Sequence, residues 1–168
     1  MDAMTIDAKV VKFGDNIDTD VILPGKYLTI TDPSELGIHA MEGISKDFAS
    51  RAAAGVIIVA GEHFGQGSSR EHAPIALKAS GVKCVVASSF ARIFFRNAIS
   101  IGLPAVECPD IWPKVSEGDE LSVDLERGEI RNVSTGKEMR VEPMPQHILE
   151  VLKDGGIIEH LVRMRHER

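Results

Sequence analysis

Residues 61–74 read GEHFGQGSSREHAP, and the six residues before them, 55–60, read GVIIVA. The earlier run is apolar and β-branched, which is typical of a buried strand. The three glycines that follow let the backbone bend sharply and lie close to a ligand. Two serines, an arginine and a helical pattern come next, so the stretch predicts a strand, a glycine loop and a helix start. We therefore expect an α/β fold built around this unit.

The same loop has the composition of a site for a small anion. Backbone N–H groups at the start of a helix point outward and favour negative charge. Arg70 adds a planar, permanently charged group that suits a carboxylate. The adjacent hydroxyls of Ser68 and Ser69 are available for hydrogen bonds or for chemistry.

Other interpretations of the loop differ in how well they fit. Ser68 and Glu71 form an S-x-x-E capping box, which would need no ligand. A dinucleotide-binding loop fits poorly, because Arg70 stands where the last glycine of G-x-G-x-x-G would be. No Gly-Lys-Ser/Thr ends the stretch, which excludes a P-loop, and Ser68 is in no G-x-S-x-G elbow of a serine hydrolase.

The rest of the chain alternates strands and helices up to about residue 108, and then changes to short runs of alternating polarity. The first part predicts parallel strand pairing, and the second part predicts an antiparallel meander. We expect mixed β-structure with flanking helices and two β-α units. The predicted strands are 8–13, 19–23, 55–60, 82–87, 104–108, 120–125, 130–133 and 138–141; the predicted helices are 33–41, 46–53, 70–80, 90–101 and a terminal stretch interrupted at Gly155-Gly156.

Composition predicts one globular domain over residues 1–168, in which 43% of the residues are hydrophobic. The net charge of −6 argues against nucleic-acid binding, which needs a basic surface. No apolar run approaches the roughly 20 residues of a membrane helix, and the first residues lack the basic region of a signal peptide. We therefore expect a cytoplasmic protein that binds neither nucleic acid nor membrane. Cys84 and Cys108 are expected to be buried thiols in a reducing compartment.

Three motifs, in the right order, resemble the aconitase superfamily. Residues 65–73 resemble its serine–arginine loop. Residues 12–20 and 24–28 resemble the opening of the small subunits of isopropylmalate isomerase and homoaconitase, and residues 88–98 resemble a third landmark of those subunits. The resemblance runs from about residue 10 to residue 104 and more loosely to the C-terminus. It implies the swivelling β/β/α domain of this superfamily.

The resemblance also implies half of an active site. Enzymes of this kind are hydro-lyases, and the isopropylmalate branch converts 2-isopropylmalate to 3-isopropylmalate by dehydration and rehydration in leucine biosynthesis. They use a [4Fe–4S] cluster with one open iron as a Lewis acid. Such a cluster needs about three cysteines in a dedicated loop, whereas this chain has two cysteines in separate runs. The cluster is therefore expected in a separate large subunit, and no metal ligands are expected in this chain.

The resemblance assigns the base to Ser68, which would act as an alkoxide and remove a proton next to a carboxylate. A serine hydroxyl is far too weak an acid to ionise alone, so backbone N–H groups and Arg70 would have to stabilise the oxyanion. Ser69 and Arg70 match the residues that hold a substrate carboxylate.

The loop after Pro24 is expected to distinguish substrates, because in the family it faces the variable group of the substrate. Relatives that act on homocitrate-like tricarboxylates are expected to carry an arginine at this point of the loop. This chain has Thr29 there instead, with the apolar residues Leu28 and Ile30 on either side. Burying a third carboxylate without a cation is costly, which favours isopropylmalate, although Lys26 could reach an anion. Homoaconitase and dimethylmalate-type hydratase small subunits remain alternatives, as does a stand-alone anion-binding regulatory module.

Two further pairs of charged residues are ambiguous. Alternation along the predicted strand would put Asp18 and Asp20 on one face, and we expect them to shape a turn or the entrance rather than to form a catalytic dyad. Arg92 and Arg96 are one helical turn apart. An exposed face or a clamp on a neighbouring loop is the simpler interpretation, and a contact with another subunit is the alternative.

Overall fold

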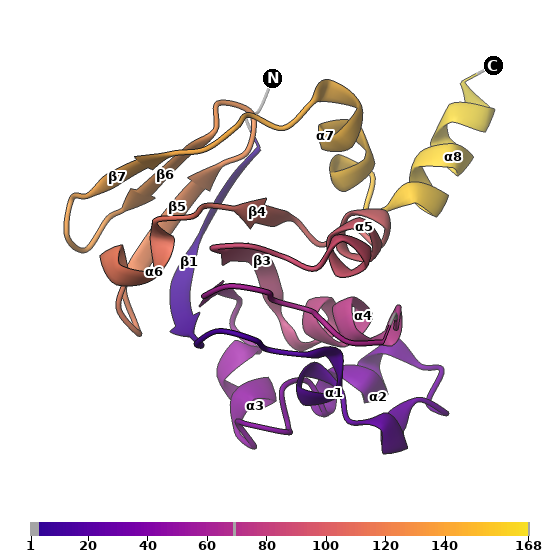
Figure 1. Cartoon of the computed structure of the whole chain (residues 1–168). Helices are drawn as coiled ribbons and strands as arrows, with labels where there is room; N and C mark the ends of the chain where they lie inside the picture. Colours follow the sequence, from indigo (N-terminus) through magenta and orange to yellow (C-terminus); the bar gives the residue numbers. More distant parts are fainter. Residues whose placement is uncertain (1–3, 69, 168) are drawn as a thin grey trace.

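A seven-stranded mixed β-sheet runs through the centre of the fold (Figure 1). The structure is a computed structural model that describes residues 4–68 and 70–167. The strands are β1 (Thr5–Lys12), β2 (Val56–Ala60), β3 (Val82–Ala87), β4 (Ala105–Glu107), β5 (Glu120–Asp124), β6 (Glu129–Asn132) and β7 (Glu138–Arg140). Their order across the sheet is β4-β3-β2-β1-β5-β6-β7.

Short helices surround this sheet. They are α1 (Thr19–Ile22), the 3₁₀ turn η1 (Gly25–Tyr27), α2 (Pro33–Ile38), α3 (Phe48–Ala52), α4 (His72–Ser80), α5 (Arg92–Ser100), α6 (Ile111–Lys114), α7 (Gln146–Lys153) and α8 (Ile157–His166).

The strands β1 to β4 pair in parallel. Helix α4 connects β2 to β3, and α5 connects β3 to β4, which confirms the two predicted β-α units. Because parallel strands point the same way, the carboxyl ends of β2 and β3 meet at one edge of the sheet. Ligands of open α/β sheets bind outside that edge, and the loops that precede α4 and α5 start there.

The strands β5 to β7 form an antiparallel meander, as predicted, and β5 pairs with β1. The meander thereby extends the parallel half of the sheet into a single mixed sheet. The α/β class with mixed β-structure and flanking helices is therefore confirmed.

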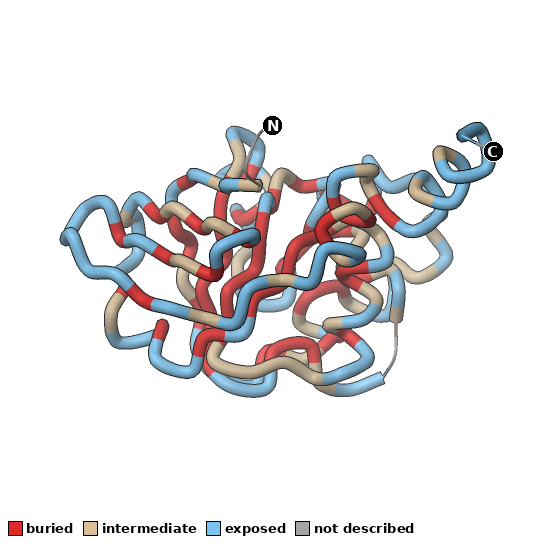
Figure 2. The backbone as a smooth tube through the Cα atoms, turned by 90° about the horizontal axis from the view of Figure 1, so that it is seen from above, coloured by how far each residue is buried: buried red, intermediate tan, exposed pale blue. Residues whose placement is uncertain are grey.

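Alternate side chains of β2 enter two apolar cores on opposite faces of the sheet. Val56, Ile58 and Ala60 join the cluster that includes residues of α2, α3 and α4, whereas Ile57 and Val59 join the cluster that includes residues of α6, α7 and the meander. A strand covered on both faces needs no polar side chain. Figure 2 shows the buried residues concentrated along the sheet, while the C-terminal helix is largely exposed.

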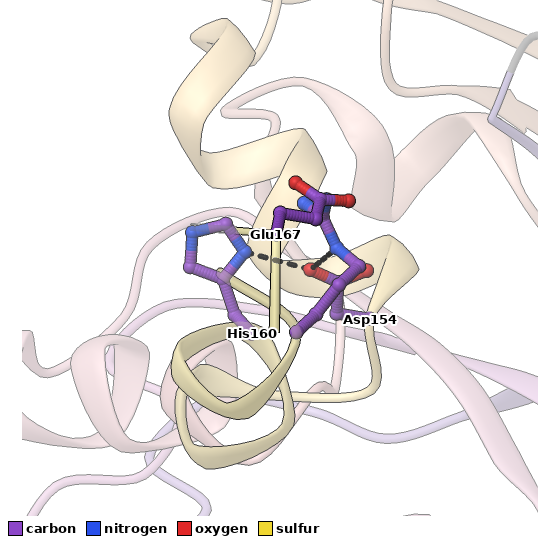
Figure 3. A network of polar contacts seen from close by, with 4 residues as sticks. Asp154, His160 and Glu167 are labelled. Atoms are coloured by element: carbon purple, nitrogen blue, oxygen red, sulfur yellow. Dashed lines mark hydrogen bonds and ion pairs between the residues drawn. The ribbon is translucent and has the colours of Figure 1, made fainter. Parts of the chain in front are cut away.

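An ion-pair network around Asp154 joins the last two helices (Figure 3). Arg163 Nε donates to both carboxylate oxygens of Asp154, at 2.9 and 2.8 Å. His160 Nδ1 lies 2.7 Å from Asp154 Oδ2. Arg163, and secondarily His160, hold the pKa of the Asp154 carboxyl below its ordinary value. The network fixes the turn at Gly155-Gly156, where the terminal helical stretch is interrupted as predicted.

Several local predictions are wrong, among them the following. The segment 19–23 is the one-turn helix α1 and not a strand, because Asp18 Oδ1 accepts a hydrogen bond from Val21 N at 2.9 Å and caps a helical turn. Its β-branched composition favours a strand, but the local cap outweighs that preference. The helices α4 and α5 begin at His72 and Arg92, each two residues later than the predicted 70 and 90.

Candidate active site

The glycine loop lies between two other segments and is tied to both by backbone hydrogen bonds. On one side, Gly65 N donates to Ile17 O at 2.7 Å, and Thr19 N donates to Gln66 O at 2.9 Å. These bonds bring the first sequence motif, residues 12–20, directly against the serine–arginine loop.

On the other side, the loop is tied to the start of α5. Phe64 N donates to Ser89 O at 3.1 Å, and Ala91 N donates to Phe64 O at 3.0 Å. Phe64 also contacts the rings of Phe90 and Phe94, with centroid distances of 6.0 and 5.2 Å. The three motifs that carry the family resemblance therefore meet at one place in the fold.

Gly65 is essential to this packing. Its φ of +84° lies in the region that favours glycine. A Cβ atom at this position would overlap the side chain of Phe94, which is buried. Only a residue without a side chain lets the loop lie this close to α5.

Ser68 lies in the loop before α4 and is exposed. Its carbonyl accepts a hydrogen bond from Thr19 Oγ1 at 3.0 Å, and Thr19 is only 3% exposed. The capping-box interpretation is wrong, because α4 begins at His72 and its N-cap residue is Glu71. Among the described residues, the Ser68 hydroxyl has no hydrogen-bond partner, so it remains available. Ser69, also predicted to bind substrate, lies outside the described residues.

Arg70 is anchored by an acid from the first motif. Its Nη1 donates to Asp20 Oδ1 at 3.3 Å, and the same oxygen accepts from Gly25 N at 3.0 Å. Both Nη atoms of Arg70 lie 3.8 Å from the position that a Cβ of Gly25 would occupy. Asp20 therefore joins the serine–arginine loop to the start of the predicted specificity loop. Asp18 and Asp20 do not share the face of a strand, because α1 replaces that strand and Asp18 caps it.

A cavity of about 200 Å³ opens where these segments meet. Ser68 and Arg70 line it together with residues from α1, the glycine loop and α5. Its lining residues are Thr19, Gly65, Gly67, Ser68, Arg70, Ala91, Arg92, Ile93, Phe94 and Asn97. The participation of Arg92 was not predicted, since helical spacing alone did not show which loop it would face.

The four described residues expected to distinguish substrates do not line this cavity. Lys26 and Thr29 are exposed, whereas Leu28 and Ile30 are half-buried and pack against the core cluster on the α4 side of the sheet. Tyr27 holds the loop in place. Its ring stacks on that of His39 with centroids 3.7 Å apart, and its hydroxyl donates to Glu42 Oε1 at 2.6 Å.

The two buried thiols do not fit the ligand set of an iron–sulfur cluster. Cys84 and Cys108 are buried and unpaired, as predicted, and burial raises the pKa of the Cys84 thiol. A cysteine binds an iron–sulfur cluster as the thiolate, which burial disfavours at Cys84. Within residues 4–68 and 70–167, no three His, Cys, Asp or Glu side chains are grouped to hold a metal ion. In the same ranges, every helix is too short or too polar to cross a membrane.

The fold and the position of the loop agree with the swivelling domain that the sequence motifs imply. Residues 41–110 match the family model described as the aconitase C-terminal domain. The structure is similar to a crystal structure of 3-isopropylmalate dehydratase from Methanocaldococcus jannaschii, with a TM-score of 0.89 and 43% identity over 96% of both chains. It also shares its fold, at a TM-score of 0.50 and 20% identity, with aconitase X from Thermococcus kodakaraensis; the match covers 83% of this chain and 92% of the other.

Similar proteins narrow the class further. The 3-isopropylmalate dehydratase small subunit of Caldanaerobacter subterraneus is 51% identical over 156 residues, which are 93% of this chain and 97% of that protein. The isopropylmalate/citramalate isomerase small subunit of Methanocaldococcus jannaschii is 52% identical over 93% of both chains. The chain belongs to the family of 3-isopropylmalate dehydratase small subunits.

Proposed function

We propose that this chain supplies the proton-transfer half of an active site that converts 2-isopropylmalate to 3-isopropylmalate by dehydration and rehydration, a step of leucine biosynthesis. The observation that carries the proposal is that Ser68 and Arg70 line one small cavity at the carboxyl edge of the parallel strands. They do so in a chain that is 51% identical to a 3-isopropylmalate dehydratase small subunit.

Ser68 is the base in this proposal. Its oxygen takes the proton from the carbon next to a substrate carboxylate during dehydration, and returns a proton during rehydration. The nearby positive charge of Arg70, which lines the same cavity, favours the ionised oxygen. The exposure of Ser68 fits this role, because a base has to reach the substrate. Ser68 is also not needed as the N-cap of α4, since Glu71 takes that position.

Arg70 binds a substrate carboxylate, together with Ser69. Asp20 accepts from one Nη atom of Arg70, which leaves other N–H groups of the guanidinium for a carboxylate. The side chain of Arg70 is 23% exposed and that of Asp20 is 69% exposed, so the pair orients a half-buried guanidinium. Asp20 is a positioning residue, since it acts through Arg70.

A large aconitase-like subunit completes the site. Ser68 is exposed in this chain alone, and in our proposal a second protein covers the cavity and excludes water from the reaction. The [4Fe–4S] cluster belongs to that subunit in our proposal, because the thiols of this chain do not fit it. We place the complex in the cytoplasm, where free buried thiols such as Cys84 and Cys108 are usual.

The loop at Lys26, Leu28, Thr29 and Ile30 reads the variable group of the substrate once the large subunit is in place. It lies next to the site through Gly25, which contacts the Asp20–Arg70 pair. The loop lacks an arginine, so a third carboxylate would have only Lys26 as a cation from it. Isopropylmalate is therefore the proposed substrate, and a homoaconitase or dimethylmalate-type hydratase is the alternative.

A substrate comparison tests the proposed function. The chain is mixed with its large subunit, and kcat/KM is measured for isopropylmalate, homoaconitate and dimethylmaleate. We expect isopropylmalate to be preferred by at least tenfold. A complex that turns over homoaconitate or dimethylmaleate better would replace the proposed substrate with that one.

Thr29→Arg tests the specificity loop. The new cation should favour a third carboxylate and disfavour an isopropyl group, so the ratio of kcat/KM for homoaconitate to that for isopropylmalate should rise. A charge-assisted hydrogen bond of about 1.5–3 kcal/mol corresponds to roughly ten- to a hundred-fold. Thr135→Arg, at an exposed position between β6 and β7, is the control and should leave the ratio unchanged. A shift of less than threefold for Thr29→Arg would show that this loop does not read the variable group.

A further inference from the structure

Arg92 lies on the rim between two hollows of the surface. It lines the cavity that contains Ser68 and Arg70, and it also lines a groove of about 850 Å³ between α5 and the segment that leads into α7. Arg96, one turn further along α5, lines the groove but not the cavity. The two arginines that looked equivalent in the sequence therefore have different surroundings.

Backbone hydrogen bonds hold the start of α5 against the glycine loop. These bonds fix the position of the backbone at Arg92. Ala91 N donates to Phe64 O at 3.0 Å, and Phe64 forms an isolated β-bridge with Phe90. Phe94 lies one turn after Ala91 and occupies the space that a side chain at position 65 would need. These backbone bonds and ring contacts hold the backbone at the start of α5, and with it the position of Arg92, against the serine–arginine loop.

The two arginines of the cavity differ in their partners. Arg70 is paired with Asp20, whereas Arg92 forms no ion pair with an acid in residues 4–68 and 70–167. An exposed guanidinium at the rim of a small cavity, without a carboxylate of its own, is suited to bind one from a ligand.

The proposed substrate has two carboxylates, since both isopropylmalate isomers are substituted succinates. Arg70 accounts for one of them. We infer that Arg92 is a substrate-binding residue that holds the second carboxylate across the same cavity. This inference rests on the proposed function. It assigns the binding of both carboxylates of the substrate to this chain, in the cavity that Ser68 also lines.

Binding of two probe acids to the assembled complex tests this role without relying on turnover. Succinate carries both carboxylates, and butyrate has the same chain length with only one. Their dissociation constants are measured by calorimetry for the wild-type complex and for complexes with Arg92→Gln, Arg92→Lys and Arg96→Gln. Size-exclusion chromatography checks that each variant still assembles with the large subunit.

We expect Arg92→Gln to weaken succinate binding by ten- to a hundred-fold, the usual effect of losing a charge-assisted hydrogen bond. Butyrate binding should change by less than threefold. Arg92→Lys should restore part of the loss, because a lysine keeps the charge without the planar geometry, and Arg96→Gln should leave both constants within threefold of wild type.

Three results would overturn the inference. Unchanged succinate affinity in Arg92→Gln would show that Arg92 does not bind a carboxylate of the ligand. An equal loss for succinate and butyrate would show a general disturbance of the site. Failure of Arg92→Gln to assemble, while Arg96→Gln assembles, would assign Arg92 to the subunit interface. Failure of the proposed function is a separate result, namely a wild-type complex that binds succinate but does not convert isopropylmalate.

Discussion

Replacing Ser68 with alanine is expected to lower kcat of the reconstituted enzyme by at least about a thousand-fold, within the range of general-base contributions. The substitution removes the only atom of this residue that can accept the substrate proton. The free energy of unfolding should change by less than about 0.5 kcal/mol, because the side chain is exposed and does not cap α4. Turnover and thermal unfolding of the same preparation check both parts.

A matched control separates chemistry from general damage. Ser50 is an exposed serine of α3, which does not line the cavity. Ser50→Ala should therefore retain wild-type kcat. Retention of more than about a tenth of kcat in Ser68→Ala would show that another group removes the proton and that Ser68 only contributes to the shape of the loop.

The second large effect concerns Gly65, whose lack of a side chain lets the serine–arginine loop lie close to α5. Gly65→Ala should destabilise the chain by about 2–4 kcal/mol. Part of this is the cost of a side chain at a φ of +84°, and the larger part is the overlap with the buried Phe94. For a chain of this length the loss lowers Tm by roughly 5–15 °C, and it should also displace Ser68 and reduce kcat.

Gly14 provides the control for this substitution. A Cβ at Gly14 would meet no atom within 4 Å, so Gly14→Ala should leave Tm within about 2 °C of wild type. A Gly65→Ala variant as stable as Gly14→Ala would contradict the close packing of the loop on α5.

Much of the parallel half of this fold could be predicted from the sequence, because its signals are local. The strand β3 was predicted with the bounds that the structure has, since a buried parallel strand reads as an unbroken apolar run between two turns. The loop before α4 was located by its three glycines, two of which, Gly65 and Gly67, have a positive φ that favours glycine.

What could not be predicted depends on contacts between distant residues. Asp20 and Arg70 are 50 positions apart, and no pattern within either motif shows that they pair. The pairing of β5 with β1 is of the same kind, because alternation identifies a strand but not its neighbour. The strand prediction for segment 19–23 failed for a different reason. The side chain of Asp18 caps a helical turn there, and this outweighs the β-branched composition of the segment.

In the candidate site, too, some residues could be predicted from the sequence, whereas the role of others depends on contacts between distant residues. Family resemblance pointed to Ser68 and Arg70, and the structure places both at one cavity. Arg92 was noticed for its spacing from Arg96, yet only the packing of Phe64 against Phe90 and Phe94 brings it to the rim of that cavity. The spacing of two residues in the sequence therefore does not show what each of them faces in the folded chain.

The most direct test of the central claim is the rate of isopropylmalate turnover as this chain is added to a fixed amount of its large subunit. If the chain supplies the base, the large subunit alone and this chain alone should be inactive, and the rate should rise with added chain until the two are equimolar. The Ser68→Ala chain should bind equally well and give no rate. Turnover by either subunit alone, or full activity with the Ser68→Ala chain, would contradict the claim that this protein carries the proton-transfer half of the active site.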